Sequence, residues 1–119
     1  MPDMKQLKDL GLHTEDGLAY CADDPEFYAE MLQEYAAESP EKAAELACFY
    51  AARDWPNYAI RAHSLKSTSR MIGAQALSDR ARDLEAAAKA GDEPAVAAAH
   101  APFLAALDAL TGRLKELLG

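Results

Sequence analysis

The sequence is poor in the residues that build disulfide frameworks and metal sites. Cys21 and Cys48 are its two cysteines, and they lie far apart without forming a CxxC pair. This argues against both a disulfide framework and a zinc site. We expect both cysteines to be small core or half-buried residues. The three histidines are equally scattered, so we predict no metal site.

Long apolar runs and an excess of basic residues are also missing. No apolar run approaches the roughly 18 residues that span a bilayer, and the N-terminus lacks a basic region followed by an apolar one. We therefore expect a soluble, cytoplasmic protein with no membrane partner. The net charge of −8 argues against a nucleic-acid partner, because nucleic acid demands a basic surface.

Aromatic residues make up only 8% of the chain, whereas alanine supplies much of its hydrophobic half. Alanine-rich sequence with few β-branched residues is typical of helices. A chain of 119 residues suffices for one compact domain, so we predict a single domain over residues 1–119. The 6 glycines are dispersed and form no phosphate-cradling loop, which argues against an ATP-binding domain.

Helix start signals divide the first half of the chain. Two short helices precede Asp24-Pro25, which begins a longer helix. Ser39-Pro40 repeats this signal and predicts a further segment that ends near Arg53.

The second half of the chain is predicted to hold three longer helices, over about 55–72, about 74–90 and from 92 onward. Pro102 lies inside the last one and removes one hydrogen bond, so we expect a kink near 98–101 rather than two helices. The long helices are amphipathic and their connections are short. This predicts an all-α fold, an antiparallel four-helix bundle with short N-terminal helices, and we expect a monomer.

The helix over about 55–72 separates a core face from a polar face. At about 100° per residue, one stripe faces the core, comprising Tyr58, Ala62, Leu65, Ser69 and Ile72. A polar set lies roughly 120–140° away and faces water, comprising His63, Lys66, Ser67 and Arg70. Imidazole, with an unperturbed pKa of about 6.5, offers a neutral ring nitrogen as a nucleophile near pH 7.

Charge is distributed unevenly around this histidine. Residues 1–52 carry a net charge of −9, residues 53–82 carry +4, and residues 83–119 carry −3. His63 therefore lies in the one basic region of an acidic chain. An anionic phosphoryl group and an acidic partner surface would both be attracted to it.

Residues 63–74 resemble the H-x-L-K-G pattern of the histidine-containing phosphotransfer (HPt) domains of multistep two-component signalling. Here the pattern reads His-Ser-Leu-Lys-Ser and is followed by small residues and Ile72-Gly73. The next helix also resembles the family, because residues stand where its pattern leads one to expect them, namely Leu77, Ala81, Leu84-Glu85 and Gly91-Asp92. Weaker similarity extends upstream through residues 24–35, so the resemblance covers nearly the whole chain.

The resemblance implies a phosphocarrier rather than a self-sufficient enzyme. A neutral nitrogen of His63, Nε2, would attack the aspartyl phosphate of a receiver domain. Lys66 would neutralise phosphoryl oxygens, Ser67 would donate a hydrogen bond, and Arg70 would add a more distant cation. Ser67 departs from the family, where glycine leaves room for the partner. We expect activity to persist with an altered partner fit or phosphoryl lifetime.

The implied partners are response regulator receiver domains and a hybrid sensor histidine kinase. No cofactor is expected in this chain, and Mg²⁺ is expected on the receiver. Ile60 and Met71 fall outside the core stripe, and we expect them on the partner surface. Two alternatives stay open: a helical scaffold that docks a receiver without transfer, and a dimerisation fragment of a histidine kinase.

The other two histidines have ordinary interpretations. We expect His13 to be a surface residue in a polar turn, and His100 to be half-buried on the last helix and hydrogen-bonded to the backbone. Trp55, near a helix start, is expected to be a packing residue or a hydrophobic anchor.

Overall fold

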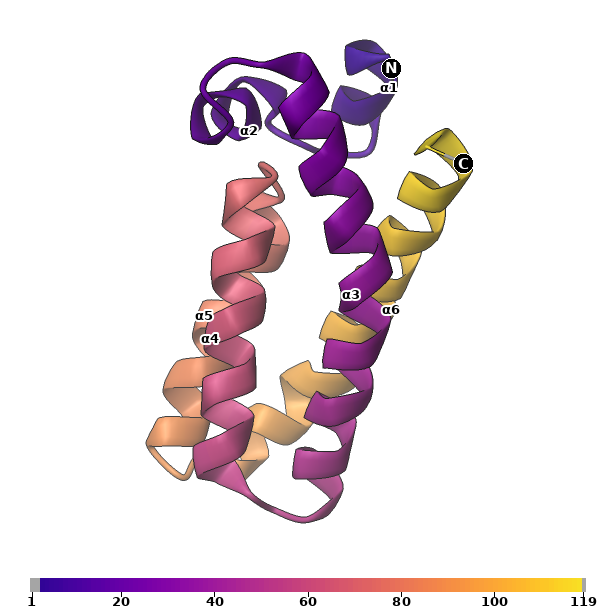
Figure 1. Cartoon of the computed structure of the whole chain (residues 1–119). Coiled ribbons are helices and arrows are strands. Elements are labelled where there is room, and N and C mark those ends of the chain that lie inside the picture. The colour runs from indigo at the N-terminus through magenta and orange to yellow at the C-terminus, as the bar shows by residue number, and fades with distance from the viewer. Residues whose placement is uncertain (1–2, 119) are drawn as a thin grey trace.

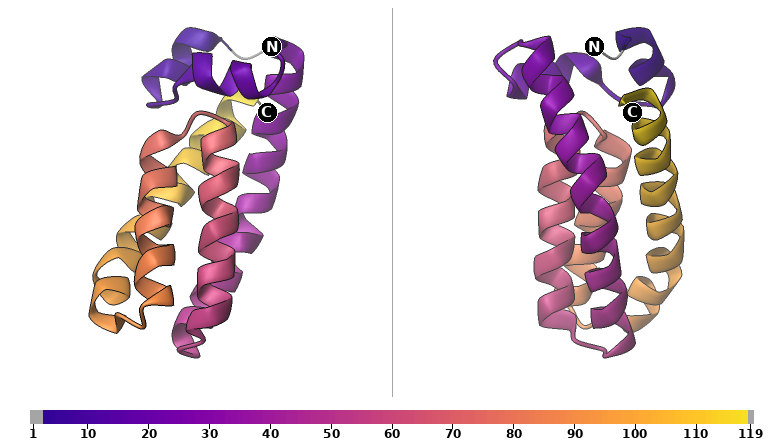
Figure 2. Two further views of the ribbon diagram at one scale, coloured as in Figure 1. Left: turned by 90° about the vertical axis from the view of Figure 1, so that its left-hand side faces the viewer. Right: turned by 45° about the vertical axis from the view of Figure 1, so that its right-hand side comes forward.

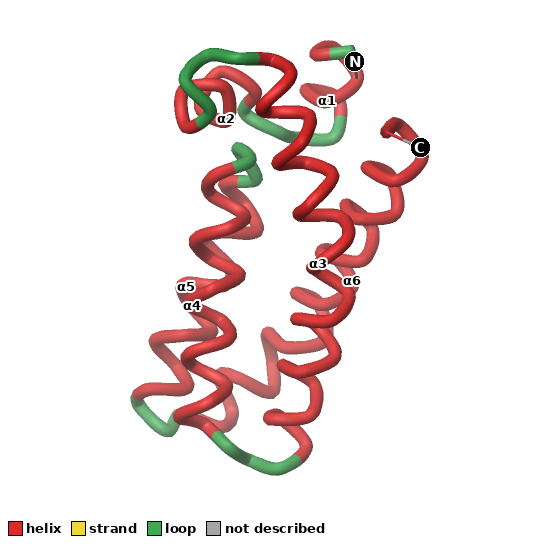
Figure 3. Tube along the Cα trace, in the orientation of Figure 1, coloured by secondary structure: helices red, strands yellow, loops and turns green. Residues whose placement is uncertain are grey.

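Every regular element in the computed structural model, which describes residues 3–118, is an α-helix. The helices are α1 (Met4–Asp9), α2 (Thr14–Tyr20), α3 (Pro25–Ala51), α4 (Trp55–Met71), α5 (Gln75–Lys89) and α6 (Glu93–Leu118). Short loops connect them, as the tube in Figure 3 shows.

The four long helices, α3 to α6, lie side by side, with sequential helices antiparallel (Figure 1). Helix α4 packs against α3 and α5, and α6 packs against the same two helices, which closes the bundle. Helices α1 and α2 lie across one end, next to the turn between α4 and α5 (Figure 2). The predicted antiparallel four-helix bundle with short N-terminal helices is confirmed.

The prediction of a helix start at Ser39-Pro40 was wrong, because α3 runs unbroken through Pro40. A proline inside a helix removes one backbone hydrogen bond. Packing on both sides of Pro40 offsets this loss: Tyr35, Ser39 and Leu46 are all buried. In addition, the Tyr35 hydroxyl lies 2.8 Å from Oγ of Ser69 on α4. Helix α6 likewise continues through Pro102, as predicted.

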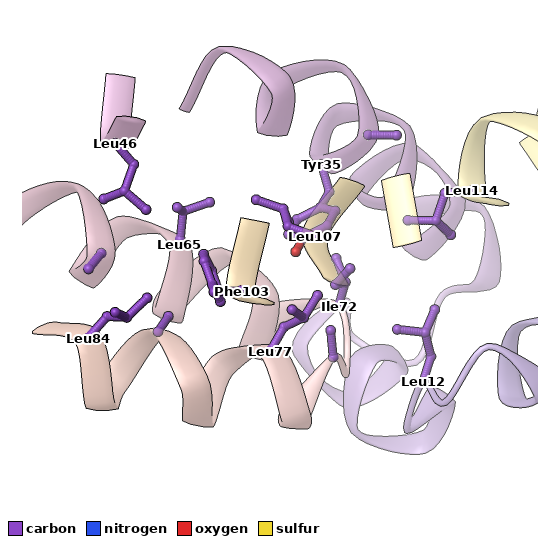
Figure 4. Close-up of a cluster of buried hydrophobic side chains, with 14 of the residues drawn as sticks. Leu12, Tyr35, Leu46, Leu65, Ile72, Leu77, Leu84, Phe103, Leu107 and Leu114 are labelled. Atoms are coloured by element: carbon purple, nitrogen blue, oxygen red, sulfur yellow. The ribbon is translucent and has the colours of Figure 1, made fainter. Parts of the chain in front are cut away.

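The core is built from the inward stripes of the long helices. Figure 4 shows Leu65 of α4 and Ile72, the residue that caps its C-terminus, beside Leu77 and Leu84 of α5, with Phe103 and Leu107 of α6 among them. All five residues of the predicted core stripe, four in α4 and Ile72 at its C-cap, are buried. Burying one such large apolar side chain contributes about 1.5–3 kcal/mol, and this packing fixes which face of α4 meets water.

The turn after α4 holds the α4–α5 hairpin against the N-terminal segment. Gly73 adopts a φ of +84°, and a Cβ there would collide with the backbone carbonyl of His13. The His13 N–H donates to the Gly73 carbonyl at 2.8 Å, and the Tyr28 hydroxyl donates to the Ile72 carbonyl at 2.7 Å. Only glycine combines this backbone conformation with so close an approach.

An aromatic cluster of buried and partly buried rings fills the opposite end of the bundle. The His100 ring stacks on Tyr50 with ring centroids 4.0 Å apart, and its Nδ1 lies 2.8 Å from the Tyr58 hydroxyl. His100 is therefore more buried than predicted, and its partner is a side chain rather than the backbone. Burial lowers the pKa of His100. Trp55 packs edge-on against Tyr50 and Tyr58, as expected of a packing residue.

The two cysteines have different environments, and both thiols are free. Cys21 is buried, as predicted. For Cys48 the prediction was wrong, because it lies on the outer face of α3 and is exposed. Apolar character alone therefore did not bring this side chain into the core.

Helix α6 is long and apolar enough, by length and composition alone, to cross a membrane. Its best 18-residue window has a mean hydropathy of 1.3. Residues 94–107 carry no Asp, Glu, Lys or Arg, and Asp108 ends this stretch before it reaches 18 residues. Core helices of soluble proteins pass the same test, and α6 packs against α3 and α5 in the bundle.

Candidate functional site

His63 projects from the outer face of α4, and 57% of its side chain is exposed. Its position follows from the helical period, because Ala62 and Leu65 on either side point into the core. The N-cap carboxylate of Asp54 accepts from the Asn57 N–H at 3.3 Å and fixes the start of the helix.

A carboxylate from the neighbouring helix holds one nitrogen of this imidazole. Oε2 of Glu85 on α5 lies 2.9 Å from Nδ1 of His63. Lys66 donates to Oε1 of Glu85 at 2.9 Å, and the Lys89 ammonium lies 3.0 Å from Oε2. Only 8% of the Glu85 side chain is exposed. Glu85 therefore joins His63 and two lysines into one cluster.

Small residues bring α5 close enough to α4 for this contact. Ala81 and Ala88, one turn on either side of Glu85, are buried against the bundle. The Ser78 hydroxyl donates to the Lys66 carbonyl at 2.9 Å and ties the two helices together. The α4–α5 hairpin, whose turn contains Gly73, thus sets the alignment of Glu85 with His63.

Glu85 is ionised despite its burial. Burial by itself raises the pKa of this carboxyl, but hydrogen bonds from Lys66, Lys89 and His63 outweigh it and lower the pKa to about 2. An ionised carboxylate only accepts hydrogen bonds, so Nδ1 of neutral His63 carries the ring proton. The lone pair of the ring is consequently on Nε2, away from Glu85.

The other predicted site residues are arranged unequally around His63. Lys66 is only 28% exposed, and its ammonium is hydrogen-bonded to Glu85 rather than directed at open solvent. Ser67, one turn beyond His63, is half-buried, and Arg70, nearly two turns beyond, is exposed. The structure thus brings Lys66 into the cluster through Glu85.

Glu85 and Lys89 were missed as site residues by sequence reasoning. The available signals were their i, i+4 spacing, which allows an ion pair, and the place of Glu85 directly after Leu84 at the edge of an apolar stripe. Neither signal reveals His63 as the third partner, because that contact joins residues 22 positions apart.

An open groove of about 800 Å³ begins at His63 and continues between the start of α4 and the end of α5. Its α4 wall is formed by Trp55, Pro56, Ala59 and Ile60, and its α5 wall includes Glu85, Ala88 and Lys89. Ile60 is 64% exposed, as predicted for a residue outside the core stripe. The groove is thus mostly apolar, with charged residues at the His63 end.

The remaining candidate residues have simple surroundings. His13 is 58% exposed, with Nδ1 3.5 Å from a carboxylate oxygen of Asp16, which fits the expected surface position. Met71 is exposed, as predicted. Within residues 3–118 no group of three His, Cys, Asp or Glu side chains could hold a metal ion.

Comparison with known families gives one match. A family model described as Hpt domain matches residues 30–118, about three quarters of the chain, including all of α4, α5 and α6 and most of α3. No curated protein and no solved structure matches.

Proposed function

The chain belongs to the Hpt domain family, and from this premise we propose that it carries a phosphoryl group on His63 from one receiver-domain aspartate to another. Hpt domains act in phosphorelays, are in general phosphocarriers rather than kinases, and interact with response regulator receiver domains. The observation that carries the assignment to His63 is the 2.9 Å contact between its Nδ1 and Glu85.

The chemistry follows from the tautomer that this contact imposes. The Nε2 lone pair attacks the phosphorus of the aspartyl phosphate, the bond from phosphorus to the aspartate oxygen breaks, and the carboxylate leaves with its electron pair. The ring becomes a phosphorylated imidazolium that keeps its hydrogen on Nδ1. Glu85, whose pKa is about 2, remains an anion beside that positive ring.

Transfer to the next receiver is the same step in reverse. A receiver carboxylate oxygen attacks the phosphorus, the N–P bond breaks, and Nε2 regains its lone pair. Phosphoryl transfer depends mainly on in-line positioning and charge stabilisation. We assign the carboxylates and Mg²⁺ of the step to the receiver, and no cofactor to this chain.

The groove beside His63 is the proposed docking surface. Its apolar α4 wall, with the exposed Ile60, suits an apolar face of the receiver. Lys89 at the groove and Arg70 beyond it suit an acidic partner surface. A relay contact must form and dissolve, so we expect a modest, transient interface. We propose that the protein is a cytoplasmic monomer. A hybrid sensor histidine kinase would be the source of its phosphoryl group.

A transfer assay against phosphorylated receiver domains tests the proposal. The parent should take up acid-labile phosphate, and the His63→Gln variant should take up none. His13→Gln is a matched control, because His13 is equally exposed and also faces a carboxylate. Equal labelling of the parent and His63→Gln would refute the proposal.

The same assay separates the two alternatives. A docking scaffold would bind the receiver with or without His63 and would show no transfer. A kinase fragment able to phosphorylate itself would be labelled by ATP in the absence of any other protein.

A further inference from the structure

The three partners of Glu85 are divided unequally between its two carboxylate oxygens. Among residues 3–118, Oε1 is contacted by Lys66 alone, whereas Oε2 is contacted by both His63 and Lys89. A buried oxygen that loses its last donor leaves an unpaired polar atom, which is costly. Lys89 is therefore the donor that can leave with both oxygens still paired.

We infer that Lys89 exchanges Glu85 for the phosphoryl group on His63, while Lys66 stays with Glu85. The inference rests on the proposed function, because it requires a phosphoryl group on Nε2. It differs from the role that the sequence predicted for Lys66, which becomes a positioning residue acting through Glu85.

Exposure separates the two lysines in the same way. The Lys66 side chain is 28% exposed and that of Lys89 is 66% exposed. A mostly solvated lysine on a flexible four-carbon stem changes partners readily. Lys66 is held on α4, whose backbone carbonyl at this residue also accepts from Ser78.

Reach and charge also favour Lys89. Its ammonium and Nδ1 of His63 contact the same oxygen, so they lie no farther apart than the sum of two hydrogen-bond lengths. A phosphoryl group carries close to two negative charges near neutral pH, against one on Glu85. The phosphoryl group therefore attracts the Lys89 ammonium more strongly than Glu85 does.

The exchange would alter the docking surface as well as the phosphoryl group. Lys89 lines the groove together with His63 and Ile60, whereas Lys66 does not. Movement of Lys89 toward Nε2 would change the charge at the edge of the groove next to His63. The phosphorylated and unphosphorylated proteins would then present different grooves to a receiver.

The test uses phosphoramidate, a small phosphoryl donor, on the full chain, so that no receiver interface is involved. The pH titration of the phosphohistidine is followed by ³¹P NMR in the parent, Lys89→Met and Lys66→Met. We expect Lys89→Met to raise the midpoint of the phosphoryl titration by about half a pH unit. Lys66→Met should move it less, and should lower the thermal midpoint of unfolding more. Lys8→Met, which removes an exposed, carboxylate-paired lysine on α1, is the matched control.

A shift for Lys66→Met equal to or larger than that for Lys89→Met would overturn the inference and leave the proposed function intact. The proposed function fails separately if the parent forms no phosphohistidine on His63, and the inference then fails with it. Should Lys66→Met not fold, Lys89→Met still decides: a midpoint equal to that of Lys8→Met overturns the inference.

Discussion

Oε2 of Glu85 lies 2.9 Å from Nδ1 of His63, across the interface between two antiparallel helices. A carboxylate in this place selects one imidazole tautomer and leaves the other ring nitrogen free to react. The phosphoryl chemistry that we propose for the exposed histidine would thus depend on a nearly buried residue of the neighbouring helix.

Glu85→Ala should mix the two tautomers of His63 and slow its phosphorylation by about ten- to hundredfold, because a charge-assisted hydrogen bond is lost. Glu85→Gln should restore much of the rate, since its amide oxygen can accept from Nδ1. ¹⁵N NMR of the ring reports the tautomer, and phosphoramidate labelling reports the rate. An unchanged tautomer in Glu85→Ala would contradict the assignment.

Glu85 should also make stability depend on acid. Its pKa is about 2 in the folded protein against 4.5 ordinarily, so the unfolded chain binds the proton more readily. The stabilisation is complete above pH 4.5 and disappears as the pH falls through about 2. We expect roughly 1–3 kcal/mol, because two of the three partners are flexible lysines. The free energies of unfolding of the parent and of Glu85→Gln, measured in urea, should differ at pH 7 and converge near pH 2.

His100 should add a second acid dependence at milder pH. Burial lowers its pKa from 6.5, so its contribution is complete above pH 6.5 and is lost as the pH falls through the lower folded value. His100→Gln, which keeps an acceptor for the Tyr58 hydroxyl, should flatten the stability profile below pH 6.5. Thermal unfolding of the parent and of His100→Gln over pH 5–8 measures the difference, and parallel profiles would contradict this role of His100.

Gly73→Ala should destabilise the protein by about 1–3 kcal/mol, because it combines a positive φ with a collision against the His13 carbonyl. Gly112→Ala is the contrasting variant. Gly112 lies within helix α6 with open space around its Cβ position, and alanine there should stabilise by about 0.5–1 kcal/mol. Denaturant midpoints compare the two, and equal effects would argue against the close approach at Gly73.

Ser67→Gly should separate partner fit from intrinsic reactivity. Removing this side chain one turn from His63 should speed transfer from a receiver but leave phosphoramidate labelling unchanged. Glycine within a helix costs about 0.5–1 kcal/mol. Ser64→Gly, at another half-buried serine of α4, controls for that loss. Equal acceleration by both variants would point to helix flexibility instead.

Periodicity within one helix was sufficient to predict much of this protein. The spacing from Tyr58 to Ile72 placed His63 on the outer face, and the motif around it indicated its chemistry. Local start signals were less dependable: Pro40 resembles a helix start, yet buried neighbours on both sides carry α3 through it. The role of Glu85 could not be predicted, because it depends on the alignment of α5 with α4 rather than on either helix alone.

The link between His13 and Gly73 bears on where this domain begins. The family match starts at residue 30, inside α3. A chain cut there would lose the His13 N–H that pairs with the Gly73 carbonyl and the Tyr28 hydroxyl that pairs with Ile72. It would also expose the end of the hairpin that aligns Glu85 with His63. The contacts that hold this hairpin therefore extend beyond the region matched by the family model, and a cut intended to preserve them belongs upstream of His13.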